Sequence, residues 1–146
     1  MQEALLNDEE PYVTILIHVR TLIGHVKEVL HDLREMEAEE LASAVVSTRN
    51  VFVSSRNELS EVLGWLPPLA ENKLNKEDVE EFEEILRKYL QANDFIVRLE
   101  LELIRLPYLE FETELDHRVE KARVLEELHI HKMTFNECNE LLMDFE

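Results

Sequence analysis

Residues 76–107 read KEDVEEFEEILRKYLQANDFIVRLELELIRLP, and this stretch decides the fold. Its apolar residues recur every three or four positions: Val79, Phe82, Ile85, Leu86, Tyr89, Phe95, Ile96, Leu99, Leu103 and Leu106. This spacing places them on one face of an α-helix. Residues 97–103 also alternate with period two, but Leu, Glu and Arg favour helix over strand. We therefore predict a helix over residues 76–106, with Asn75 as its N-cap and Pro107 as its end.

Two segments before this helix carry the same spacing. Pro11 suits the first turn of a helix, because its missing N–H would lack a partner there anyway, so we predict a helix over residues 10–36. The next segment, residues 38–64, is less regular. Its residues 44–54 are rich in β-branched side chains and leave a hairpin open, although the flanks keep the helical spacing. We favour a helix, straight or kinked, that ends at Gly64.

The end of the chain predicts two further helices. Apolar residues at helical spacing predict one helix over residues 108–131. Thr134 and Glu137 then match a capping box, in which each side chain bonds a free backbone N–H of the first turn. This motif predicts a short last helix over residues 135–145.

Together these helices predict an all-α protein. Helices of about 25–30 residues are ~40 Å long, and their apolar stripes can be buried only against one another. Short connections make neighbouring helices antiparallel. We predict a single domain over residues 1–146, built as an antiparallel up-and-down four-helix bundle with long helices and a short C-terminal fifth helix.

The composition is that of a folded protein in a reducing compartment. Hydrophobic residues make up 45% of the chain and charged residues 33%, which is enough for a core and a solvated face. A single cysteine excludes an internal disulfide framework. The first ten residues are acidic, unlike a signal peptide, and no apolar run approaches the ~20 residues that span a bilayer. We expect a soluble, cytoplasmic protein.

The chain is strongly acidic, with 33 Asp and Glu against 15 Lys and Arg and a formal net charge of −18. Such a surface repels nucleic-acid backbones and anionic membranes, so we expect no direct binding to either. It would instead attract a partner with a basic surface. The simpler interpretation is that the charge keeps a helical protein in solution.

No residue pattern indicates catalysis or a cofactor. Gly24 and Gly64 stand alone, so there is no glycine-rich loop to hold a phosphate. Cys138 is the only cysteine and, at helical spacing, faces the core beside Leu141 or Leu142. We expect a protein that is not an enzyme and that carries no cofactor.

A metal site is the most tempting chemical motif. Glu114 with His117, and Glu126 with His129, match the Glu-x-x-His element that di-iron bundles place on helices. Both copies lie on one predicted helix, ~18 Å apart along its axis, whereas a di-iron site needs them on facing helices. We interpret all four as surface residues that form local histidine–glutamate pairs.

The apolar loop predicted at residues 65–75 is a candidate recognition surface. The prolines at 67–68 end the preceding helix, and Trp65, Leu66 and Leu69 surround them. The loop either folds over the end of the bundle as a lid or presents Trp65 to a partner as an anchor. Lids are the commoner arrangement.

A second candidate surface combines aromatic and acidic side chains. Tyr108 and Phe111 alternate with Glu110 and Glu112 just after Pro107. Its simpler interpretation is a segment with one side in the core and the other in solvent. The wide stripe of the first helix also leaves apolar surface for a second subunit, so we predict self-association.

Three classes of function follow from these observations. We favour a non-enzymatic protein–protein interaction module, such as a helical adaptor, regulator or chaperone-like protein, that binds through a helix face or the Trp65 loop. The first alternative is an acidic inhibitor that mimics nucleic acid and occupies a basic enzyme. The second alternative is a ferritin-like metal-binding bundle.

Overall fold

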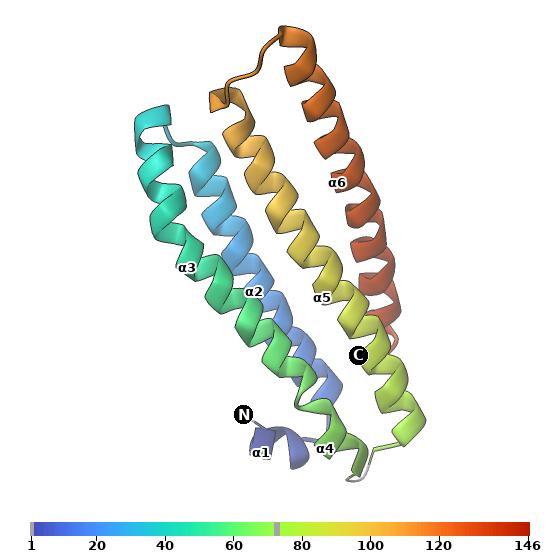
Figure 1. Ribbon diagram of the computed structural model, residues 1–146. Helices are drawn as coiled ribbons and strands as arrows, with labels where there is room; N and C mark the ends of the chain where they lie inside the picture. Colours follow the sequence, from blue (N-terminus) through green and yellow to red (C-terminus); the bar gives the residue numbers. More distant parts are fainter. Residues whose placement is uncertain (1, 72–73) are drawn as a thin grey trace.

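The computed structural model describes residues 2–71 and 74–146, and these residues form helices and the turns between them (Figure 1). The long helices are α2 (Pro11–Arg34), α3 (Ala38–Leu63), α5 (Lys76–Arg105) and α6 (Glu114–Met143). The short ones are α1 (Gln2–Leu6), α4 (Leu66–Glu71) and the 3₁₀ turn η1 (Leu106–Tyr108). The all-α prediction is confirmed, and residues 44–54 are helical rather than a hairpin. None of these described helices is both long and apolar enough to cross a bilayer.

The long helices run alternately up and down along the chain, with α5 between the α2–α3 pair and α6 (Figure 1). α5 packs along much of its length against α6, and it also contacts α2, α3 and α4. Within the described ranges, α6 packs extensively only against α5, and α2 packs chiefly against α3. The helices are therefore arranged around α5, and not every long helix has two full neighbours.

Side-chain caps and a proline fix where the helices begin. Asn75 is the N-cap of α5, as predicted: its Oδ1 accepts hydrogen bonds from the backbone N–H groups of Glu77 and Asp78, at 2.8 and 3.4 Å. Pro11 occupies the first turn of α2, also as predicted. Thr113 caps α6, where its hydroxyl oxygen accepts a bond of 3.1 Å from the backbone of Asp116.

The core consists of three clusters of buried apolar side chains, and α5 contributes to each of them. One lies at the end covered by α1 and α4 and includes Leu16, Phe82 and Leu142. Another joins the opposite ends of α2, α3 and α5 through Val26, Leu30, Leu33, Leu41 and Ile104. The third joins α5 to α6 through Ile96, Leu99, Val124 and Leu128.

The predicted division of the last segment is wrong in two respects. α6 is continuous, so there is no break after residue 131 and no separate helix over residues 135–145. The Thr134 hydroxyl donates to the carbonyl oxygen of Ile130, at 3.3 Å, and therefore bonds within the helix instead of capping a new one. The start at residue 108 is also wrong, because the chain leaves η1 in an extended conformation and α6 begins only after Thr113.

The predicted loop at residues 65–75 contains helix α4, although its residues 72 and 73 lie outside the described residues. The prolines at 67–68 fall in the first turn of α4, where a missing N–H carries no penalty. Leu66 and Leu69 are buried in the core and are not available to a partner, which corrects their assignment as binding residues. Trp65 is half-buried, and its ring centroid lies 5.3 Å from that of His18.

Replacing Trp65 by Ala is expected to lower the free energy of unfolding by about 2 kcal/mol, because the half-buried indole packs against the core beneath α4. Urea denaturation followed by circular dichroism measures the change. Ile17→Ala is the matched control, since Ile17 is 60% exposed. Its truncation should change the unfolding free energy by less than about 0.5 kcal/mol. Equally small changes in both variants would show that the indole does not stabilise the packing at the end covered by α1 and α4.

Candidate functional site

The aromatic and acidic candidates lie in the connection between α5 and α6. Tyr108 is 52% exposed, and Glu110 and Glu112 are also exposed. Phe111 is half-buried, and its ring meets that of His117 edge-on at 5.1 Å. Tyr108 alone among these residues lines a cavity, at the end of the groove described below.

The four metal candidates remain apart from one another. Glu114 forms an ion pair with Arg118 at 3.2 Å, and His117 is in contact with an aromatic ring. Glu126 and His129 are exposed on α6. In the part of the chain that the structure describes, no three His, Cys, Asp or Glu side chains come close enough to hold a metal ion.

Cys138 lies in the core with Leu142, on the inner side of α6. Burial raises the pKa of its thiol, with an opposing contribution from Lys88. A thiol that stays protonated is a poor nucleophile and a poor metal ligand. This cysteine is therefore a packing residue.

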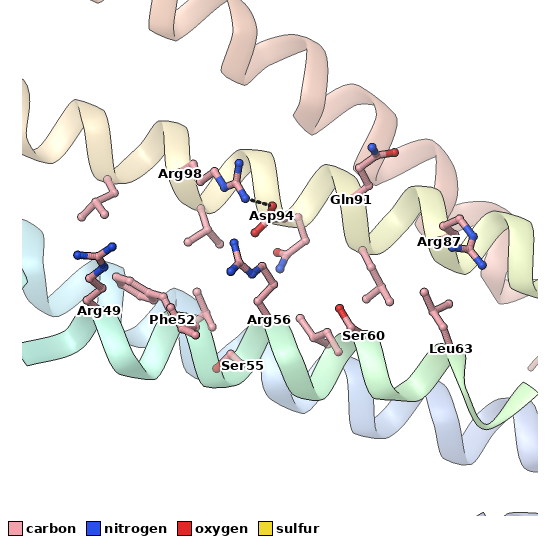
Figure 2. Close-up of a pocket in the computed structure, with 17 residues that line it drawn as sticks. Arg49, Phe52, Ser55, Arg56, Ser60, Leu63, Arg87, Gln91, Asp94 and Arg98 are labelled. Atoms are coloured by element: carbon pink, nitrogen blue, oxygen red, sulfur yellow. Dashed lines mark ion pairs between the residues drawn. The ribbon is translucent and has the colours of Figure 1, made fainter.

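A groove between α3 and α5 is the feature that sequence reasoning missed (Figure 2). It consists of two adjoining cavities of about 480 and 540 Å³, which share Arg49, Phe52 and Leu101 in their walls. Its apolar lining includes Val26, Leu41, Val45, Phe52, Leu59, Leu63, Leu90, Val97 and Leu101. Cavities of this size are typical of binding sites.

Five arginines line the groove: Arg49 and Arg56 from α3, and Arg87, Arg98 and Arg105 from α5. Figure 2 shows that the side chain of Arg56 reaches across from α3 toward α5. The only carboxylate in the lining is that of Asp94. In a chain with a net charge of −18, the groove is therefore a local region of positive charge.

Two of these arginines have local partners, and three form no ion pair within the described residues. Arg87 pairs with Glu83 at 2.8 Å, and Arg98 pairs with Asp94 at 2.9 Å, each one turn away on α5. Arg49, Arg56 and Arg105 form no ion pair with any described residue. Exposed pairs within one helix contribute little to stability, so all five guanidinium groups are available to an anionic ligand.

Asn93 is the one polar residue among the buried side chains of the described chain, with 5% of its surface exposed. It lies between Leu90 and Val97 on the groove face of α5. Among the described residues, the Tyr12 hydroxyl is the one buried side-chain polar group without a partner, so the amide of Asn93 is not in that position. Its polar atoms reach the open space of the groove, where water or a ligand can bond to them.

The groove exists because the middle of α3 is too polar to pack against α5. Only Leu41, Leu59 and Val62 of α3 are buried, and the side chains between them that face α5 include Arg49, Ser55 and Arg56. The signal was present in the sequence as the polar Thr48 and Ser55 that interrupt the stripe of this segment. Only the packed structure shows that the interruptions leave an open groove.

The lining of the groove offers apolar surface, cationic hydrogen-bond donors and the amide of Asn93. No histidine or glutamate is among the described residues that line it, and its carboxylate, Asp94, is held in an ion pair. Ser55 also lines a separate hollow that includes His25 and Glu58. Comparison of the chain with models of protein families, with curated proteins and with solved structures finds no match.

Replacing Asn93 by Leu is expected to raise the free energy of unfolding by about 1 kcal/mol, because the leucine adds apolar contact with Leu90 and Val97 on the groove face of α5. Thermal denaturation should show a midpoint about 2–4 °C higher. Gln91→Leu is the control on the same helix, since Gln91 is exposed. Its effect should stay below about 0.5 kcal/mol. A loss of stability in Asn93→Leu would mean that the leucine side chain does not fit between Leu90 and Val97.

Proposed function

We propose that this protein is a non-enzymatic interaction module that binds an acidic amphipathic helix of a partner protein in the α3/α5 groove. The observation that carries the proposal is the combination of an apolar floor with five arginines in an otherwise acidic chain. The composition alone led us to expect a basic partner. The charge of the groove supports an acidic segment at this site instead.

The dimensions of the groove match those of a helix. The lining on α5 extends from Arg87 to Arg105, which is ~27 Å along the axis, or about five turns. A helix lying in it would present apolar side chains at every third or fourth position to the floor. Arg49 and Arg56 are two turns apart, ~10 Å, and so are Arg98 and Arg105. Carboxylates spaced by seven residues on the flanks of the bound helix would face such pairs.

The two parts of the groove contribute differently to binding. The apolar floor supplies most of the free energy, because it removes apolar surface of both partners from water. The arginines at the rim accelerate the encounter and select for an acidic helix. A neutral or basic helix of the same shape would supply no countercharge to Arg49, Arg56 and Arg105, which form no ion pair with a described residue.

A designed helical peptide tests the proposal. Its sequence carries Leu at the floor-facing positions and Glu along both flanks, with a fluorescein label for anisotropy. We expect it to bind the full chain, and we expect Arg49→Glu/Arg56→Glu to weaken binding by about 30-fold, since reversed charges repel the Glu flanks. Rising salt concentration should weaken binding to the unmodified chain.

Two controls separate groove binding from general attraction. The variant Lys76→Glu/Lys88→Glu changes the net charge equally at positions that do not line the groove, and it should bind the Glu-flanked peptide nearly as well as the unmodified chain. A peptide with Lys in place of Glu should bind weakly in the groove. Equal affinity for both peptides, or equal weakening by both double variants, would refute the proposal.

A further inference from the structure

α6 carries two apolar stripes on opposite faces. The inner stripe includes Val124, Leu128, Cys138 and Leu142, all buried. The outer stripe consists of Leu115, Val119, Ile130, Met133 and Leu141, which are 49–67% exposed. Ile130 follows Leu128 by two positions, which is about 200° around a helix. The outer stripe therefore points away from α5 into solvent.

The outer stripe has no helix against it within the described chain, because α6 packs extensively only against α5. Several large apolar side chains exposed on one helix face mark a candidate interaction site. The stripe extends from Leu115 to Leu141, ~39 Å along the axis, and is long enough to fill the α3/α5 groove. Within the described chain, the outer stripe of α6 therefore has no helix packed on it, and the α3/α5 groove has no helix bound in it.

The charges on the two surfaces also match in spacing. Glu126 and Glu137 stand within the outer stripe, eleven residues apart, and neither forms an ion pair with a described residue. Arg87 and Arg98 line the groove on α5, also eleven residues apart. On an α-helix both separations are ~16 Å, or about three turns. The two carboxylates can therefore face the two guanidinium groups at the same time.

We infer that the α3/α5 groove binds α6 of a second copy of this chain, with the outer stripe turned toward the α5 wall, so that Glu126 and Glu137 within the stripe meet Arg87 and Arg98 and its apolar residues meet the apolar residues of α5 between these arginines. The inference rests on the proposed function, because it names the acidic helix that occupies the groove. The contact joins two different surfaces, the groove of one copy and α6 of the other.

Charge exchange between two variants tests this contact. Sedimentation velocity at high micromolar concentration and physiological salt should show that the unmodified chain self-associates. The groove variant Arg87→Glu/Arg98→Glu and the α6 variant Glu126→Arg/Glu137→Arg should each weaken self-association by about 30-fold, because like charges then meet in the contact. An equimolar mixture of the two should recover the affinity to within about threefold, since every contact pairs opposite charges again.

The control variant is Glu28→Arg/Glu35→Arg, which makes the same change in net charge as the α6 variant at exposed residues in α2 and at its C-cap. It should associate as tightly as the unmodified chain or more tightly. Circular dichroism and thermal denaturation establish that each variant is folded before it is compared. A monomeric unmodified chain overturns the inference, and so does a mixture that fails to recover.

Failure of this inference is distinguishable from failure of the proposed function. If the chain is monomeric but binds the Glu-flanked peptide in the groove, the groove accepts an acidic helix that is not its own α6. If the chain self-associates and the Arg87→Glu/Arg98→Glu variant does so equally well, the contact lies elsewhere and the inference is wrong. Absence of peptide binding to a chain shown to be monomeric would overturn both.

Discussion

The structure depends on the burial of α5 against helices on two sides. Ile96 and Leu99 pack against α6, while Ile104 joins the cluster with Val26 of α2. A helix with apolar residues on so wide a face cannot bury all of them against a single neighbouring helix. The other long helices therefore take their positions from α5, and the end of the chain is secured where Arg20 of α2 bonds to the side chains of Asn139 and Glu146.

An arrangement around one central helix leaves its outer members with unfilled faces. α3 is held against α2 and touches α5 without closing on it, because Arg49, Ser55 and Arg56 stand where apolar contacts would be needed. α6 is held against α5 and has apolar residues left over on its far side, such as Val119 and Ile130. The groove and the outer stripe are thus two consequences of the same packing. Neither would exist in a bundle whose long helices each had two full neighbours.

The sequence predicts what depends on local chemistry. Asn75 and Pro11 mark helix starts because caps and prolines act within one turn. The prediction from the sequence is wrong where two local signals compete. Thr134 matches a capping box, but its hydroxyl bonds back to Ile130 inside α6. The groove escapes prediction for a different reason, since Arg56 and Arg98 come from helices that only tertiary packing brings together. The interruption of the stripe at Ser55 is visible in the sequence, but a polar gap in a stripe does not reveal what faces it.

The residues of the groove stabilise the isolated chain poorly. A leucine at position 93 would add apolar contact with Leu90 and Val97, and apolar residues in place of Arg49 and Arg56 would allow α3 to close on α5. The groove arginines that form no ion pair with a described residue would gain a countercharge from an anionic, partly apolar ligand between the two helices. An amphipathic helix with carboxylates on its flanks supplies both kinds of contact. Its insertion would give α3 and α5 a second shared neighbour besides α2.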